Sequence, residues 1–191
     1  MKKFFAVLLV ALFGAMPLFA DDAADVKATI LKSAEAGLKG DYSAVLAFYT
    51  PDFQATTPEM TINYEMSKTM FLAMDGKHPE EFLTFTMMVA QELKLSEEMK
   101  AKIREAAKSP EFMKQYETLA PMMRVMAKIG VGVALKTIKF VSFKVDGDNA
   151  TAVYEALTVD KNGDVKEAVC TTSLRRVNGA WLICRSVMEY K

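Results

Sequence analysis

The side chains that could do acid–base or metal chemistry are few and dispersed. His78 is the only histidine of the 191-residue chain and precedes Pro79, in a segment that we predict to be a loop. Asp52 follows Pro51, where a carboxylate more often bonds the backbone of its own turn than acts as a general base. One histidine and two separated cysteines do not have the spacing of a metal site. We therefore predict neither a metal nor a cofactor and expect His78 to be solvated.

Three polar residues of the C-terminal part share one predicted strand face. If residues 160–163 form a loop and Asn178-Gly179 a two-residue hairpin turn, Glu155, Thr172 and Arg185 project to the same side of the sheet. Buried charges need partners, so these residues either line a pocket or lie at a solvated edge. An enzyme would use Asp52, Glu155 or Arg185 as its acid–base groups. The predicted ligand-binding residues are Tyr49, Glu155, Thr172 and Arg185.

Tyr49 is included among the predicted ligand-binding residues because of the pattern from Gly40 to Phe53. Asp41 is a good N-cap, and Tyr42, Val45, Leu46 and Tyr49 follow at the spacing of one helix face. The pattern predicts a short helix that ends at Pro51. Because both tyrosines fall on its apolar stripe, we expect Tyr49 in the core or in a pocket.

The first twenty residues have the pattern of a secretory signal peptide. Two lysines precede the apolar run Phe4–Phe13, and Ala20 precedes Asp21. The run is short for a membrane anchor, which needs about 20 apolar residues. We predict cleavage near Asp21 and a periplasmic or secreted protein that is not embedded in the membrane. The remaining chain has 22 basic and 24 acidic residues, a net charge of −2 with no long basic run, so nucleic acid is not an expected partner.

The two cysteines of the chain are predicted to stay unpaired. With Asn178-Gly179 as the turn, Cys170 faces Val187 and Cys184 faces Ser173, so the sulfurs lie on opposite faces of the sheet. A disulfide cannot close across the sheet. We expect two buried thiols.

The hydrophobic periodicity places helices first and strands last. Helices are predicted from Asp22 to Leu38 and from Asp41, followed by two short strands and a methionine-rich helical insert over about 78–129 that Gly130 and Gly132 end. The methionines either fill a core or line an apolar groove. Four strands are then predicted as an antiparallel meander: Lys136–Val145, Asn149–Val159, Val165–Val177 and Ala180–Tyr190. This order predicts an α+β fold and a single domain over 21–191.

Two stretches of the chain resemble the NTF2-like superfamily, which includes SnoaL-like and ketosteroid-isomerase-like proteins. They are Asp25–Thr57, with Gly40-Asp41 between two helices and Pro51-Asp52-Phe53 entering a strand, and Ile138–Met188, which contains Asn178-Gly179-Ala180-Trp181. The resemblance implies helices packed on a curved antiparallel sheet, which forms a cone with a pocket at its open end. The helical insert is longer than the usual third helix of the family.

The resemblance also allows the isomerase activity to be tested residue by residue. At the position of the oxyanion-donating tyrosine this chain has Ser33, and at the position of the general-base aspartate it has Thr57. Threonine has no accessible base form near neutral pH, and serine is a poorer donor than a phenol. We therefore predict a non-catalytic binding protein for a small, largely apolar molecule. The alternatives are an enzyme with a non-standard acid–base pair and an interaction module that forms a homodimer through its sheet.

Overall fold

A single mixed sheet organises the molecule. The computed structural model describes residues 16–75, 78–160 and 163–191. The sheet has the strand order β2-β1-β6-β5-β4-β3, and every neighbouring pair is antiparallel except β1 and β6, which run parallel. The strands are β1 (Tyr49–Thr56), β2 (Thr61–Asn63), β3 (Lys139–Asp146), β4 (Asn149–Val159), β5 (Val165–Val177) and β6 (Ala180–Tyr190). The predicted α+β class and the four-stranded meander are confirmed, with the first of its strands starting three residues late.

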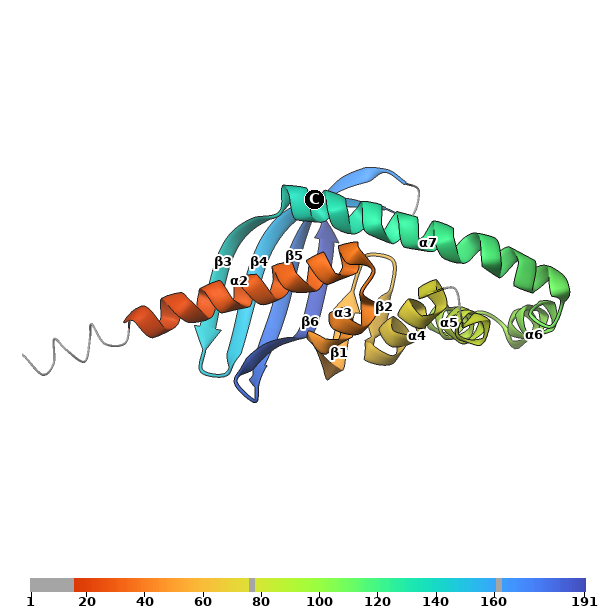
Figure 1. Ribbon diagram of the computed structural model, residues 1–191, viewed down its shortest axis with the longest axis horizontal. Helices are drawn as coiled ribbons and strands as arrows, with labels where there is room; N and C mark the ends of the chain where they lie inside the picture. Colours follow the sequence, from red (N-terminus) through yellow and green to blue (C-terminus); the bar gives the residue numbers. More distant parts are fainter. Residues whose placement is uncertain (1–15, 76–77, 161–162) are drawn as a thin grey trace, which may run out of the picture.

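The helices lie against this sheet and beyond one of its ends. They are α2 (Met16–Lys39), α3 (Tyr42–Ala47), α4 (Tyr64–Asp75), α5 (Pro79–Glu92), α6 (Glu97–Ala106) and α7 (Pro110–Thr137). In Figure 1, α2 and the last turns of α7 lie over the sheet, whereas α5, α6 and the start of α7 extend away from it. The predicted helical insert corresponds to α5, α6 and most of α7.

Two predictions fall on the residues that are not described. The predicted signal peptide spans residues 1–20, and only its last five residues lie within the described chain, as the start of α2. Residues 161 and 162 of the loop predicted over 160–163 are also outside the described residues.

The core lies between α2 and one face of the sheet. Val26 and Ile30 of α2 pack against inward-facing side chains of the strands, all of them buried: Phe53, Ala150, Ala152, Leu174, Trp181 and Ile183. The strand members alternate with more exposed residues, as expected where one face of a sheet is covered. We call this covered side the inner face of the sheet.

α7 continues through residues that were predicted to end it. It is a single helix of 28 residues that contains Pro121, Gly130 and Gly132. A Cβ added at Gly132 would lie 3.5 Å from Leu38 Cδ1 of α2, which is an ordinary van der Waals distance, so α7 packs on α2 at this point. This packing outweighs the poor helix propensity of glycine, about 1 kcal/mol per residue. The prediction that Gly130 and Gly132 end the helix was wrong, because α7 packs on α2 and β4 and continues to Thr137.

α3 is shorter than predicted, and Tyr49 belongs to a strand. Asp41 caps α3 as expected, with Ala44 N donating to Asp41 Oδ1 at 3.1 Å. The helix ends at Ala47, and Tyr49 begins β1. The pairing of β1 with β6 is interrupted between Tyr49 and Gln54. Pro51 lies in this interruption and has no N–H to donate to the ladder.

The predicted strand register was wrong by one residue in two places. Between β4 and β5 the chain reverses from Asp160 to Asp164, which bond each other through their backbones at 2.9 Å, so Val153 faces Thr171 rather than Cys170. Between β5 and β6 the turn itself is as predicted, but the register shifts after the pair Leu174–Ile183. The prediction that Glu155, Thr172 and Arg185 share a face fails because each shift reverses the side on which later residues project.

The second shift is a bulge at Cys184. Leu174 pairs with Ile183 and Ser173 with Arg185, so Cys184 is the extra residue of β6. Cys170 consequently faces Met188 rather than Val187. Both cysteines are free, as predicted, but they are half-buried rather than fully buried.

Candidate ligand-binding site

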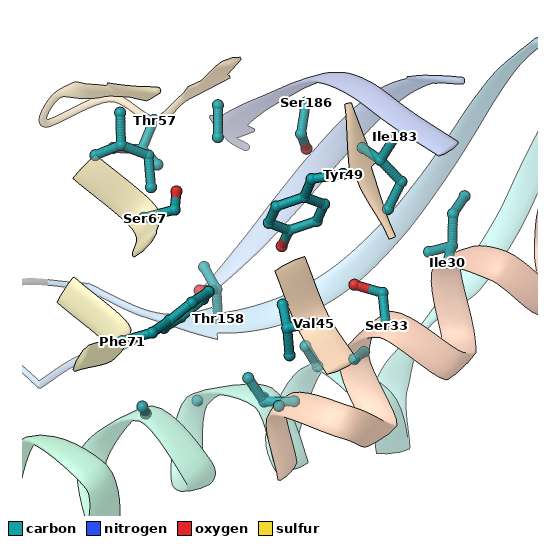
Figure 2. A pocket seen from close by; sticks show the side chains of 18 of the residues that line it. Ile30, Ser33, Val45, Tyr49, Thr57, Ser67, Phe71, Thr158, Ile183 and Ser186 are labelled. Carbon is teal, nitrogen blue, oxygen red and sulfur yellow. The ribbon is translucent and has the colours of Figure 1, made fainter. Parts of the chain in front are cut away.

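A cavity of about 860 Å³ lies between the inner face of the sheet and the helices α2, α3, α4 and α7. Ile30 and Ala34 of α2, Met70 and Phe71 of α4, and Met123 of α7 supply part of its apolar wall. Figure 2 shows side chains from the helices and from the sheet converging on the same space. Met70, Met74, Met123 and Met126 therefore line a cavity, one of the two roles considered for the methionines.

Hydroxyl groups form the polar part of the wall on the sheet side. Tyr154 Oη and Thr172 Oγ1 are 3.2 Å apart, and Thr172 Oγ1 and Ser186 Oγ are 3.3 Å apart. All three residues line the cavity, and each comes from a different neighbouring strand. Burial raises the pKa of the Tyr154 phenol well above its ordinary value, so this hydroxyl keeps its proton. The three groups form a neutral chain that can donate or accept hydrogen bonds.

Tyr49 occupies the middle of the cavity. Its ring stacks on Phe53 with a centroid distance of 4.0 Å, and Figure 2 shows it between Ser33 and Ser186. Burial raises the pKa of its phenol, while the hydroxyl of Ser33 acts in the opposite direction. Tyr49 lines the cavity, as predicted, although it reaches the cavity from a strand rather than from a helix.

Ser33 and Thr57, which stand at the positions of the catalytic residues of the isomerases, both line the cavity. Ser33 is buried, and its hydroxyl acts to lower the pKa of the Tyr49 phenol. Thr57 Oγ1 is held in its own turn, donating to Met60 O and accepting from Met60 N, both at 3.2 Å. Neither hydroxyl can serve as a base near neutral pH. The cavity thus retains these two positions without acid–base residues in them.

Tyr42 offers a hydroxyl that has no partner. Its Oη is buried and makes no hydrogen bond in the part of the chain that the structure describes. The ring is fixed by stacking on Phe71, at a centroid distance of 4.9 Å and an interplanar angle of 6°. Burial raises the pKa of this phenol, so it remains a donor. A buried donor without a partner is costly, and a bound acceptor would relieve that cost.

Charged side chains are absent from the described lining of the cavity. Glu155 and Arg185, two of the predicted site residues, project from the opposite face of the sheet. Glu155 Oε1 forms an ion pair of 2.7 Å with Lys191 Nζ, and Arg185 is exposed. Of the four predicted residues, the cavity therefore brings together Tyr49 and Thr172 only.

The other titratable candidates also lie outside the cavity. Asp52 Oδ2 pairs with Arg175 Nη2 at 3.2 Å on the surface, and His78 Nδ1 lies 3.2 Å from Glu80 Oε1. Within residues 16–75, 78–160 and 163–191, no three histidine, cysteine or carboxylate side chains are grouped to hold a metal ion.

The sequence analysis missed three cavity residues with hydroxyl groups: Tyr42, Tyr154 and Ser186. The predicted register, without the two shifts, puts Tyr154 and Ser186 on the face opposite Thr172. Tyr42 could have been predicted, because its spacing places it on the same apolar helix face as Tyr49.

The fold has counterparts among solved structures. No protein-family model matches the chain, and no curated protein matches it. An NTF2-like protein with a cystatin-like fold from Novosphingobium aromaticivorans aligns with a TM-score of 0.50 at 11% identity, covering 92% of this chain and 86% of that one.

Two other bacterial structures align with lower scores. A protein of unknown function from Mycobacterium tuberculosis has a TM-score of 0.47 at 10% identity, with 93% of this chain and 76% of that one covered. An NTF2-like protein of unknown function from Silicibacter pomeroyi has a TM-score of 0.45 at 13% identity, with 91% and 98% covered. At such identities the likeness concerns the fold alone. The chain has the NTF2-like fold.

Proposed function

We propose that this protein is an exported, non-catalytic binding protein that holds a small, uncharged and largely apolar molecule in the cavity. The observation that supports this most directly is a space of about 860 Å³ whose described lining contains no charged side chain. The volume lies within the range of pockets that enclose small molecules, about 300–1,000 Å³. A charged ligand would lose its hydration there without gaining a partner.

The hydroxyl groups of the wall define the polar end of the proposed ligand. Tyr42 Oη has no partner in the described chain, so it would donate to a carbonyl or hydroxyl oxygen. The group formed by Tyr154, Thr172 and Ser186 would supply a second polar contact. The ligand would therefore have an apolar body and one or two neutral oxygens.

Catalysis of the isomerase or dehydratase type has less support. Those reactions need a general base that is ionised near neutral pH. The alternative acid–base candidates Asp52, Glu155 and Arg185 do not line the cavity. The phenols that do line it have raised pKa values.

Export and self-association are two further parts of the proposal, and neither depends on the cavity. The N-terminal pattern supports a periplasmic or secreted location. A homodimer would form through the sheet face opposite the cavity, where Val153 and Val187 lie half-buried.

The proposal can be tested by filling the cavity. Gly130 lines it, and a Cβ added there would meet no atom within 4 Å, so Gly130→Phe would place a ring in open space. We expect this variant to bind the neutral apolar dye Nile red at least about tenfold more weakly, or about 1.4 kcal/mol. Arg185→Met, on the opposite face, is the control and should bind the dye like the wild type.

If Gly130→Phe keeps the melting temperature and circular dichroism of the wild type but binds the dye equally well, the cavity is not the binding site.

Native mass spectrometry is an independent test. In protein purified from its own host, it should detect a bound molecule in the wild type. Tyr42→Phe should lower the occupancy of that molecule, because the loss of one neutral hydrogen bond costs about 1 kcal/mol.

A further inference from the structure

The outward side of α7 is apolar and exposed. Leu119, Met122, Val125, Met126 and Ile129 are each at least one-third exposed, and Ile129 is 50% exposed. Their spacing of three and four residues places them along one side of a helix. We call these five residues the outer stripe of α7. A contiguous exposed apolar surface of this kind marks an interaction site more often than a single exposed residue does.

The charges of the same helix segment are of one sign. Between Ala120 and Thr137 the charged residues are Arg124, Lys128 and Lys136, with no aspartate or glutamate. Lys128 and Lys136 are exposed, whereas Arg124 is half-buried and acts electrostatically on Tyr42 and Tyr116. An apolar stripe with flanking cations is typical of a helix that lies on an anionic membrane surface.

The outer stripe also reaches the cavity. Met123, Ala127 and Val131 of α7 line the cavity, and Met126 lines it as well although it is 54% exposed. Met126 therefore lies where the cavity wall meets the outer stripe. A partner that covers the stripe would contact the edge of the cavity.

The composition of α7 is also suited to lipid. Among the described helices, α7 alone has the length and apolar composition needed to cross a membrane. Its last turns pack on α2 and β4, as the close approach of Gly132 to Leu38 indicates, so only one side is free. A helix held in this way can lie on a membrane but not cross it.

From these observations we infer that the outer stripe of α7 docks on the surface of an anionic lipid bilayer. A second copy of the chain is the other occupant to consider. Residues 120–137 of a second copy would present no carboxylate to the exposed Lys128 and Lys136, whereas lipid phosphates would pair with them. The inference does not depend on a ligand in the cavity, because it concerns the outer side of the helix.

Vesicle flotation tests this inference with the purified full chain. We expect the protein to float with vesicles of phosphatidylcholine and phosphatidylglycerol in equal parts, and to float less with phosphatidylcholine alone. Ile129→Glu should reduce the partition coefficient at least about tenfold, because it removes an apolar side chain from the contact and adds a like charge to an anionic surface. Lys136→Gln should reduce it about fivefold, with less effect at high salt.

The matched control places the same change on a different exposed apolar residue. Val141 of β3 is 60% exposed and lies outside α7, so Val141→Glu should float like the wild type. If the wild type does not float with the anionic vesicles, or Val141→Glu loses as much binding as Ile129→Glu, the inference is wrong. A dimer in sedimentation velocity that Ile129→Glu alone dissociates would also overturn it, since a second copy would then cover the stripe.

Discussion

Two regions of the molecule differ in how many side chains they bury. We call α2 with the sheet the sheet half, and α5, α6 and α7 the helical half. Between α2 and the inner face of the sheet, Val26, Leu174 and Trp181 are almost completely buried. Over the described residues of α5, α6 and α7, only Ala90, Tyr116 and Ala120 are buried. The sheet half therefore contains most of the apolar burial that stabilises the fold, and α5, α6 and α7 bury few side chains.

The helical half depends more on local interactions. Ser96 and Ser109 cap α6 and α7, each accepting a hydrogen bond of 3.2 Å from a backbone N–H of the first turn. Lys100 pairs with Glu97 across one turn of α6 at 2.8 Å. Caps contribute about 1 kcal/mol and exposed ion pairs less. Such a region is expected to open locally more readily than the sheet.

The largest expected effect comes from a truncation in the sheet core. Leu174 is 1% exposed, so Leu174→Ala should lower the free energy of unfolding by about 3 kcal/mol through lost burial and a new cavity. The corresponding truncation of an exposed residue of α7, Met122→Ala, should change it by less than about 0.5 kcal/mol. Urea unfolding of both variants measures the difference. Similar costs for the two would mean that the halves do not differ in this way.

A second effect should appear at alkaline pH and arise from the sheet side. Burial raises the pKa of Tyr154 above its ordinary value of 10.0, so above about pH 10 the unfolded chain loses a proton that the folded chain keeps. Stability should thus be constant below that pH and fall above it. In Tyr154→Phe the fall should be less steep by about 1 kcal/mol per pH unit.

Urea unfolding between about pH 9 and pH 11 measures this slope. Comparing slopes rather than absolute stabilities removes the separate loss of the hydrogen bond to Thr172. Equal slopes in the two proteins would contradict a buried, protonated Tyr154.

A smaller effect concerns the docking of the helical half. Tyr116 Oη donates to Ala73 O of α4 at 2.9 Å, a buried link between α7 and the neighbouring helix. Tyr116→Phe should cost about 1 kcal/mol and increase amide hydrogen exchange in α5 and α7 more than in β5. Thr118→Ala is the control, because Thr118 bonds only within its own helix, to Lys114 O. Increased exchange in β5 instead would show that the two halves unfold together.

The last prediction concerns the reactivity of the two cysteines and involves no expected change in stability. Cys170 and Cys184 are free, and burial raises the pKa of both thiols. Both should be slow to react with iodoacetamide in the folded protein, and both should react when the protein is unfolded without reductant. Intact mass should then increase by two labels. An unlabelled pair would mean that a disulfide forms, contrary to the register of β5 and β6.

The sequence was sufficient for the elements that local patterns define. Turn residues and alternation predicted β4, β5 and β6 with the bounds that the structure has. The sequence was insufficient where contacts between residues far apart in the chain determine the extent of an element. α7 continues through Gly130 and Gly132 to Thr137 and packs on α2 and β4, and no local pattern encodes this packing.

The candidate site was predictable only in part, for the same reason. Tyr49 and Thr172 were found, Tyr49 from its place among apolar residues and Thr172 from a face that also carried residues now known to point outward. Glu155 and Arg185 were assigned to that face by counting residues from the turns. One extra residue in a loop or strand reverses such a count, and its effect is visible only once the strands are paired.

The bulge at Cys184 has a consequence for how this fold can diversify. If Cys184 paired with Ser173 instead of forming the bulge, the alternation that follows Ile183 would bring Arg185 to the inner face of β6 in place of Ser186. A β6 of the same length without the bulge would thus have a cationic residue in the pocket where this chain has a neutral one. Changes that remove or create a bulge in this strand would offer related proteins a short evolutionary route between neutral and anionic ligands.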